Sequence, residues 1–157
     1  MPNTKPPIDS PELVDFIIQT AKQSPIHIHP IGAVTKNQEG KLLTEMSLMH
    51  QKGAVAFSDD GLPIQNGGVM RTALEYSKFL NVPVINHAED DCIRANGLVN
   101  EGVKSTELGL SSIPSIAETI QIKRDISILE YTGGKIHIPY ISSSESIEII
   151  RLSLIHI

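Results

Sequence analysis

Two short polar segments of this sequence carry side chains that can bind a metal ion. One reads SDDG at residues 58–61 and the other reads NHAED at residues 86–90, and each directly follows a short apolar run. Asp60 and His87 are separated by about one helix, one strand and their connections. A carboxylate oxygen together with an imidazole nitrogen suits zinc or a similar first-row ion. These two side chains are therefore the first candidates for a metal site.

The same residues also have plainer interpretations. Asp-Asp-Gly is an ordinary turn sequence, and a histidine at the end of a strand is often only hydrogen-bonded. Asp59 competes with Asp60 for the role of ligand, but neighbouring residues on an extended segment point to opposite sides. Spacing alone leaves both a metal site and a structural turn open. It allows only one of the two aspartates to reach a metal.

Apolar periodicity predicts the elements that would position these residues. Helical spacing of apolar residues follows Pro11, which can occupy the first turn of a helix capped by Ser10. Helices are predicted at 11–23, 41–52, 69–80, 114–131 and 143–152. Short apolar strands are predicted at 26–34, 54–57, 82–85 and 136–141. This alternation predicts an α/β fold, in which helices pack outside a parallel sheet.

Both common forms of such a fold place their chemistry at the carboxyl ends of the strands. Periodicity does not distinguish a doubly wound sheet from a barrel, but the rule holds for both. The two polar segments follow predicted strands, so we expect them at one rim. Residues 88–112 are polar and rich in Gly, Asn, Ser and Glu. Because a compact domain keeps a loop of this length mainly for function, they form a candidate active-site loop.

Composition indicates one ordinary globular domain. The chain has 157 residues, 40% of them hydrophobic, and a net charge of -5 with scattered Lys and Arg. No apolar run approaches the roughly 20 residues that cross a bilayer, and the first residues lack the pattern of a signal peptide. The only cysteine, Cys92, cannot form an internal disulfide. These features predict a soluble cytoplasmic protein that binds neither nucleic acid nor membrane.

Six segments, in order along nearly the entire chain, resemble class I dihydroorotases of the amidohydrolase superfamily. They read MPNTKPPI, PIGAVTKNQEGKLLTEM, GAVAFSDDGLPIQNGGVMRTALEYSK, VPVINHAEDD, VNEGVKSTELGLSSIPSIAETIQIKRD and TGGKIHIPYISSSESIEIIR. The resemblance implies a TIM-type (β/α) barrel with a zinc centre that reversibly hydrolyses (S)-dihydroorotate to N-carbamoyl-L-aspartate in pyrimidine biosynthesis. A complete barrel takes about 250 residues and eight strands. Residues 1–157 are therefore expected to form one partial amidohydrolase barrel domain with about half of the strands.

The resemblance also implies roles for individual residues. Asp60, the second aspartate of DDG, matches the metal-bridging carboxylate, and His87 of HAED matches a zinc-ligating histidine. Asn3 of MPNT matches an asparagine that contacts the substrate carboxylate, although composition alone would make it a turn residue. Tyr140 stands where the family has another histidine ligand. Because a phenol with an ordinary pKa of about 10 is a poor zinc ligand, the second zinc site is in doubt.

The remaining histidines are not expected to bind the metal. His27 and His29 form an HxH pair on one face of a predicted strand, but the sequence after them matches the family's third barrel strand, where no such pair is expected. His137 precedes Tyr140 by three residues on a predicted strand, so its side chain would leave the opposite face, and we interpret it as structural. Two further histidines lie in helical stretches without partners at ligand spacing and are expected at the surface: His50 and His156.

Parts of the family pattern are expected outside these residues. The first strand, with its HxH ligands, is expected before Met1. The aspartate that serves as general acid and base is expected beyond Ile157, so no catalytic residue is assigned here. We expect the chain alone to be inactive and to bind zinc weakly. Its last residues, RLSLIHI, end an uncapped helix, which is typical of a truncated reading frame.

Two other interpretations stay open. One is a non-catalytic dihydroorotase-like scaffold that pairs with aspartate carbamoyltransferase, and Tyr140 favours it. The other is a different cyclic amidohydrolase, a hydantoinase or allantoinase, although these relatives usually carry a carboxylated lysine where this chain has Asp60. In each case a half-barrel leaves two open sheet edges, so association of copies into a homo-oligomer is expected.

Overall fold

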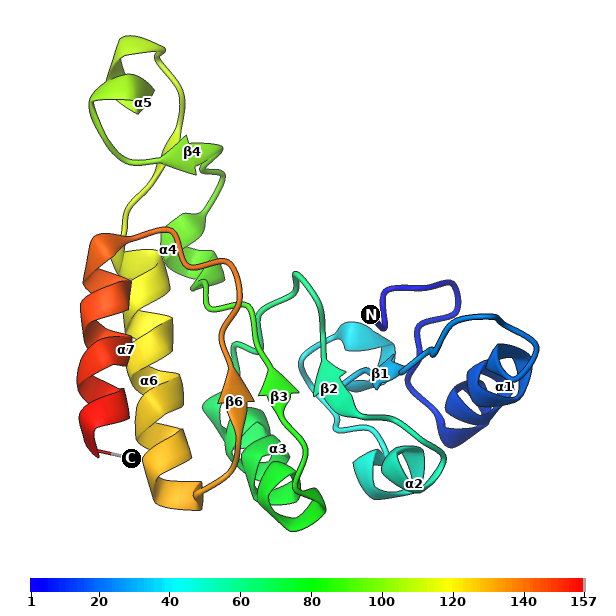
Figure 1. Ribbon diagram of the computed structural model, residues 1–157. Coiled ribbons are helices and arrows are strands. Elements are labelled where there is room, and N and C mark those ends of the chain that lie inside the picture. The colour runs from blue at the N-terminus through cyan, green and yellow to red at the C-terminus, as the bar shows by residue number, and fades with distance from the viewer. Residues whose placement is uncertain (157) are drawn as a thin grey trace.

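A sheet of four parallel strands, in the order β1-β2-β3-β6, lies at the centre of the computed structural model (Figure 1). The structure describes the backbone of residues 1–156 and the side chains through residue 154. The strands are short: β1 at Ile31–Gly32, β2 at Ala56–Ser58, β3 at Val84–Ile85 and β6 at Ile136–His137. The register places Phe57 between Gly32 and Val84, so these residues share one face of the sheet.

Helices pack apolar side chains against that face. They are α1 at Pro11–Ala21, α2 at Met46–Gln51, α3 at Gly67–Leu80 and α6 at Ile116–Thr132. The last helix, α7 at Ser144–His156, packs instead on α6 in a smaller apolar cluster. The largest fully buried side chains of this core include Phe57, Met49, Met70 and Leu74. The predicted parallel α/β architecture is confirmed. Within the described residues no helix has the length and apolar character to span a membrane.

Several elements are shorter than the sequence predicts. The strand expected at 26–34 reduces to β1, because the chain before Ile31 is irregular. The helix expected from 41 begins only at Met46, since Leu43 pairs with Thr35 in an isolated antiparallel bridge. The strand expected to reach 141 ends at His137. Pro139 has no backbone N–H to donate, and Tyr140 adopts a left-handed φ of 61°.

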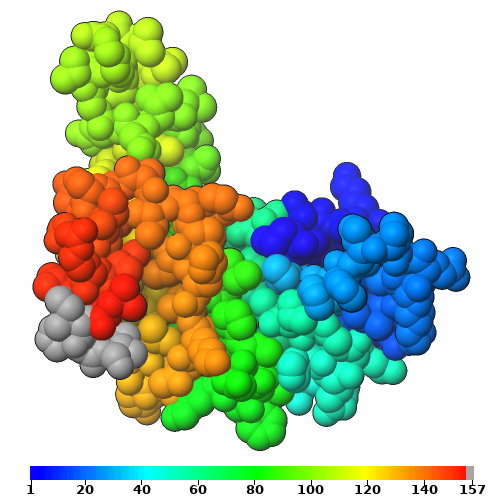
Figure 2. All heavy atoms as spheres, in the orientation of Figure 1, coloured from blue at the N-terminus to red at the C-terminus, as the bar shows by residue number. Residues whose placement is uncertain are grey.

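Residues 91–113 form a small lobe in place of the expected irregular loop. The lobe contains α4 at Asp91–Arg94, β4 at Val99–Asn100, α5 at Val103–Glu107 and β5 at Ser112–Ile113. β4 and β5 pair in parallel. Figures 1 and 2 show the lobe standing out from the body of the molecule, on the side where β3 leads into α4. It therefore lies at the carboxyl edge of the sheet, where the candidate residues are expected.

Candidate metal and substrate site

The segments that follow β2 and β3 line a common cavity. Asp59 and Gly61 from the first segment and His87 from the second line a space of about 570 Å³. Loop residues 38–41 and Arg94 of the lobe complete much of its wall. A second cavity of about 450 Å³ is lined by His87 together with Tyr140 and Glu118. His87 thus borders both cavities, and the structure brings the two polar segments to one edge of the sheet.

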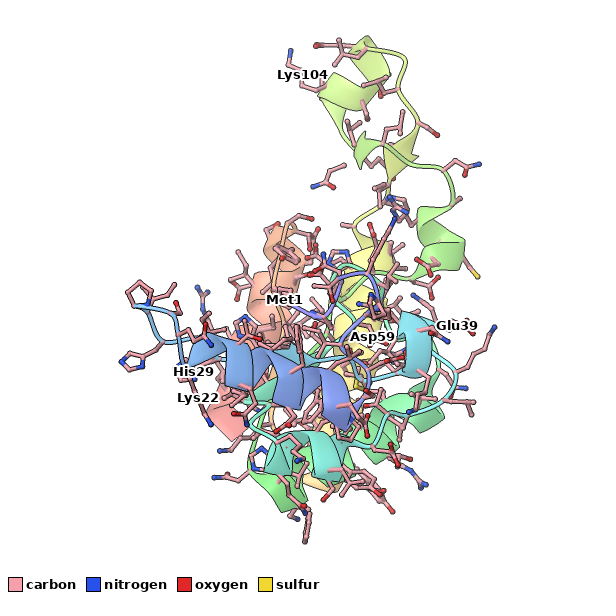
Figure 3. All side chains as sticks on the ribbon, turned by 90° about the vertical axis from the view of Figure 1, so that its right-hand side faces the viewer. Met1, Lys22, His29, Glu39, Asp59 and Lys104 are labelled. Carbon is pink, nitrogen blue, oxygen red and sulfur yellow. The ribbon has the colours of Figure 1, made fainter. Side chains whose placement is uncertain are left out.

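Asp59 is buried and fully engaged by the end of β1 (Figure 3). Its Oδ1 accepts hydrogen bonds from the backbone N–H groups of Val34 at 2.8 Å and Thr35 at 3.0 Å, and its Oδ2 accepts one from the Thr35 hydroxyl. Burial raises the pKa of Asp59 above its ordinary value, while the hydrogen bonds act in the opposite direction. This carboxylate joins β1 to β2 and has little capacity left for a metal.

Asp60 has the opposite character. The residue adopts a left-handed φ of 58°, and its backbone N–H donates to the Ser58 hydroxyl at 2.9 Å. Its half-buried side chain makes no hydrogen bond or ion pair with any residue that the structure describes. The turn therefore separates the two neighbouring aspartates. The Asp59 carboxylate is engaged in hydrogen bonds, whereas that of Asp60 is unpaired, and Asp60 itself lines neither cavity.

His87 has one ring nitrogen engaged and one without a partner. Nε2 lies 3.4 Å from Oε2 of Glu89, which in turn forms an ion pair with Arg94 at 3.1 Å. Nδ1 is buried and has no hydrogen-bond partner. If Nε2–H donates to Glu89, Nδ1 keeps a free lone pair, which is the arrangement of a metal-ligating histidine. The ring of Tyr140 lies 5.6 Å from the imidazole, tilted by 59°.

These residues fit a zinc site only in part. An unpaired carboxylate at Asp60 and an unpaired buried nitrogen at His87 suit two ligand positions. Among the described residues, however, no group of three or more His, Cys, Asp or Glu side chains converges to hold a metal ion. A tetrahedral zinc site needs more donors than these two. The ligand roles of Asp60 and His87 therefore stay predictions.

Asn3 is not brought to either cavity. Its side chain is exposed, has no hydrogen bond to a described residue, and lines neither space. The residues that follow it run beside β1, where the N–H of Ala33 donates to the carbonyl of Ile8 at 2.7 Å. The predicted contact between Asn3 and a substrate carboxylate stays a prediction.

The other histidines lie apart from this site. His27 and His29 are exposed, the centroids of their stacked rings are 6.5 Å apart, and both residues precede β1. Figure 3 shows His29 well away from Asp59. His137 is exposed on β6, so the structural role predicted for it has no packing to support it. Nδ1 of His50 lies 2.9 Å from the carbonyl of Ala54. The His156 side chain lies outside the described residues, and Cys92 is an exposed free thiol.

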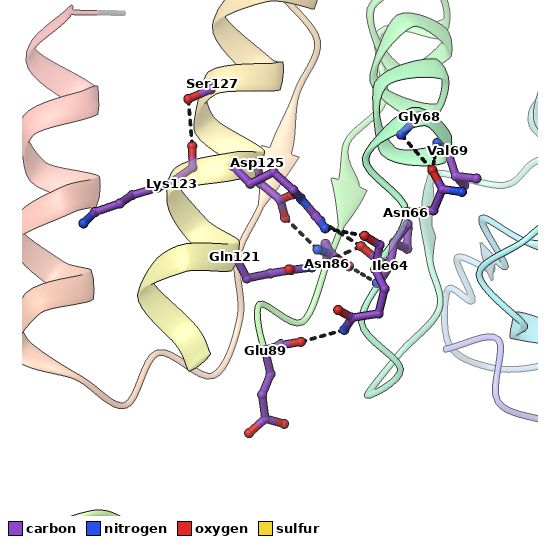
Figure 4. Close-up of polar contacts among 12 residues, drawn as sticks. Ile64, Asn66, Gly68, Val69, Asn86, Glu89, Gln121, Lys123, Asp125 and Ser127 are labelled. Carbon is purple, nitrogen blue, oxygen red and sulfur yellow. Dashed lines mark hydrogen bonds and ion pairs between the residues drawn. The ribbon is translucent and has the colours of Figure 1, made fainter. Parts of the chain in front are cut away.

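Sequence reasoning missed a polar network beside the site (Figure 4). The amide of Asn86 accepts from the N–H of Ile64 at 3.1 Å and donates to Asp125 at 2.7 Å. Arg124 and Gln121 of α6 donate to the carbonyl of Ile64 at 2.7 and 3.0 Å. A signal existed in the sequence, because Gln121 and Asp125 share the face of the predicted helix that carries Ile122 and Ile126. Buried polar residues on such a face need partners.

Comparisons with known proteins support the resemblance along the chain. The sequence profile of the family described as dihydro-orotase-like matches residues 1–146. A protein named dihydroorotase from Pelotomaculum thermopropionicum is 44% identical over 151 residues, which are 96% of this chain and 35% of that protein. A dihydroorotase from Syntrophus aciditrophicus is 43% identical over 152 residues, with 96% and 36% covered. The chain thus spans about a third of the length of these relatives.

A solved structure shows the same fold. L-hydantoinase (dihydropyrimidinase) from Arthrobacter aurescens superposes on 99% of this chain and 36% of its own, with a TM-score of 0.71 and 19% sequence identity. At this identity the likeness concerns the fold alone. The prediction of a partial TIM-type (β/α) barrel is confirmed, and the four parallel strands are an arc of that barrel.

Proposed function

This chain belongs to the dihydro-orotase-like family, and we propose on that premise that its parent protein is a cyclic amidohydrolase that interconverts (S)-dihydroorotate and N-carbamoyl-L-aspartate. The observation that carries the proposal is the cavity at the ends of β2 and β3, which brings His87 next to the DDG turn. Relatives that share 43–45% identity over 96% of the chain are named dihydroorotase. The proposal places the reaction in the cytoplasm, as a step of pyrimidine biosynthesis.

Asp60 and His87 would hold zinc in this site. Such an ion would supply Lewis acidity, which would lower the pKa of water and polarise the amide carbonyl of the substrate. The chain's own residues fix the geometry. Glu89 engages Nε2 of His87 at 3.4 Å, which orients the imidazole and leaves Nδ1 for the ligand role. Asp59 anchors the turn that presents Asp60, and Asn3 is the proposed contact for the substrate carboxylate.

Tyr140 is the observation that favours a second candidate. It stands where a histidine ligand is expected, its side chain is 67% exposed, and its ring packs on His87. A protein with this substitution that lacks a full ligand set could serve as a non-catalytic scaffold for aspartate carbamoyltransferase. The third interpretation, a hydantoinase or allantoinase, gains no support from the L-hydantoinase likeness, because 19% identity concerns the fold alone.

An exchange of segments tests the function directly. The 151 residues of this chain that align with the Pelotomaculum thermopropionicum dihydroorotase replace the matching segment of that protein, which supplies the rest of its own chain. We expect the exchange protein with Tyr140 to hydrolyse dihydroorotate weakly. Tyr140→His should raise both the hydrolysis rate and the amount of bound zinc. Asp60→Asn, added to the Tyr140→His protein, should lower the hydrolysis rate at least about a hundredfold. Hydrolysis is measured with purified protein and bound zinc by atomic absorption.

The control is Asp91→Asn, which changes an exposed carboxylate of the same cavity that has no proposed ligand role. Asp91→Asn should leave the hydrolysis rate and the zinc content within twofold of the values for the exchange protein without it. A folded Tyr140→His protein whose zinc content and activity do not rise would contradict the ligand position assigned to residue 140. Activity that survives Asp60→Asn would contradict the proposed site itself.

A further inference from the structure

The polar network between β3, α6 and residues 61–66 connects the two segments that carry Asp60 and His87 (Figure 4). We propose that Asp125 and Arg124 are positioning residues for these two side chains and act through Asn86 and the backbone of Ile64. Neither Asp125 nor Arg124 lines either of the two cavities that His87 borders. The inference rests on the proposed function, because it gives a purpose to the positions of Asp60 and His87.

Asn86 is the link between the helix and the strand end. It directly precedes His87, is 1% exposed, and uses both ends of its amide. Its Oδ1 accepts from the Ile64 N–H at 3.1 Å, and its Nδ2 donates to Oδ2 of Asp125 at 2.7 Å. Only a side chain with a donor and an acceptor can make both bonds. Any shift of Asn86 moves the peptide that carries the His87 imidazole.

Asp125 fixes that amide from α6. Its carboxylate is 0% exposed, and Oδ1 accepts from Nε and Nη2 of Arg124 at 2.9 and 2.6 Å. Burial raises the pKa of Asp125, whereas the charge of Arg124 and the hydrogen bonds from Arg124 and Asn86 lower it. A buried carboxylate that lost either partner would leave an unsatisfied polar group, which is costly. The contacts of Asp125 with Arg124 and Asn86 therefore hold the Asn86 amide in one position.

Arg124 extends the same network to the loop that follows Asp60. Nη2 donates to the carbonyl of Ile64 and Nη1 to that of Gln65, both at 2.7 Å. The side chain of Gln65 then donates to the carbonyl of Glu89 at 2.8 Å, and Glu89 is the partner of His87 Nε2. The loop behind Asp60 and the segment around His87 are thus held to each other by direct hydrogen bonds and, in addition, through Arg124 and Asp125 of α6.

Docking of α6 does not depend on this network alone. Ile122 is fully buried on the same helix and packs with Ala88 and Ile126, and other α6 side chains join the main core. A variant that trims Ile122 weakens the helix packing without touching the polar contacts. This separates loss of positioning from loss of stability.

The test follows Zn²⁺ binding and amide exchange by NMR in the full 157-residue chain. All proteins carry His27→Asn and His29→Asn, so that the exposed histidine pair cannot bind the probe. We expect Asp125→Asn to speed exchange of the Ile64 N–H at least about tenfold and to weaken Zn²⁺ binding at the His87 imidazole about three- to tenfold. Ile122→Val should lower the melting temperature and leave both readouts within twofold.

Arg124→Lys is the second variant, because its side chain is 26% exposed and the substitution keeps the charge while removing the fork. It should change both readouts in the same direction as Asp125→Asn. If both variants match Ile122→Val in exchange and in Zn²⁺ affinity, the positioning role is overturned. If the unaltered chain shows no Zn²⁺ binding at His87 but the variants still free the Ile64 amide, the proposed metal site fails and the positioning of the two segments stands.

Discussion

At the scale of single residues, the two aspartates after β2 show how backbone conformation divides roles between neighbours. Asp59 accepts three hydrogen bonds at the end of β1, while Asp60 turns away at a φ of 58° with its carboxylate unpaired. The alternation of side chains along an extended segment predicts that only one aspartate reaches a ligand. The structure adds that the other carboxylate is already engaged. The assignment of Asp60 as a metal ligand stays a prediction.

Glu118 is a second residue whose role only the structure reveals. Its carboxylate accepts from the backbone N–H groups of Ser142 and Ser143 at 2.9 and 3.2 Å and from the Ser142 hydroxyl at 2.6 Å. These groups precede α7, so the charge also lies at the favourable amino end of that helix. Burial acts to raise the pKa of Glu118, but the hydrogen bonds outweigh it, and the pKa is lowered from 4.5.

Glu118→Gln should cost about 1 kcal/mol at neutral pH, the typical value of a helix cap. Because the pKa of Glu118 is lowered in the folded state, the stability that its carboxylate adds to the wild type is fully present above pH 4.5. This stability is lost as the pH falls through the pKa of Glu118 in the folded protein. The two proteins should therefore converge in stability under acid. Urea denaturation at neutral and acidic pH measures the difference, and Glu130→Gln, exposed on the same helix, is the control. A pH-independent difference would exclude this explanation.

At the scale of elements, close packing of α3 against the turn after α6 sets a requirement for glycine. A Cβ built on Gly134 would lie 2.4 Å from the Leu74 carbonyl oxygen and 3.1 Å from its carbon. Backbone atoms of a helix cannot yield as the end of a flexible side chain does. The sequence shows Gly133 and Gly134 as a helix stop, and Gly133 does adopt a left-handed conformation. Gly134 is required because there is no room for a Cβ beside the Leu74 carbonyl, and only the structure shows this close approach.

Gly134→Ala is expected to destabilise the chain by about 1–3 kcal/mol through overpacking against α3. Thermal and chemical denaturation, followed by circular dichroism, measure the change. Gly67→Ala is the matched control, because a Cβ there meets only side-chain atoms at 3.8 and 3.9 Å. We expect that variant to stay within about 0.5 kcal/mol of the parent. Equal stability of the two variants would show that α3 can move away from the turn.

At the scale of the whole molecule, the sheet is an open arc with β1 and β6 at its ends. Beyond β1, the Ala33 N–H is satisfied by the carbonyl of Ile8. β6 pairs with β3 on one side and with no other strand among the described residues. An open strand edge is a template for pairing with another chain. The chain alone should therefore associate as its concentration rises.

His137→Lys places a charge on the exposed side of β6 and should reduce this association. Sedimentation velocity over a range of concentrations measures the association. The average mass of the His137→Lys variant should rise less with concentration than that of the unaltered chain. Tyr131→Lys adds the same charge at a position of α6 that is 77% exposed and should have no such effect. If both lysines act alike, net charge rather than the strand edge controls association.

The sequence by itself determined the class of fold, the family and the two segments that meet at the site. Apolar periodicity predicts strands and helices correctly because one face of each element must be buried. In a parallel sheet, the segments after Phe57 and Ile85 then lie at the same edge. Their motifs identify the family without any coordinates. Sequence also located the departure at Tyr140, which no periodicity could have revealed.

Only the tertiary structure decided which polar groups find partners. Asp59 meets Thr35, Asn86 meets Asp125, and Glu118 meets Ser142, each between residues far apart in the sequence. The tertiary structure also decided the bounds of elements. Leu43 pairs with Thr35, so α2 does not begin until Met46. Propensity describes a residue in its local segment, whereas hydrogen-bond partners and close approaches depend on distant segments that fold beside it. For that reason the positions of Asp60 and His87 follow from the whole arrangement around them.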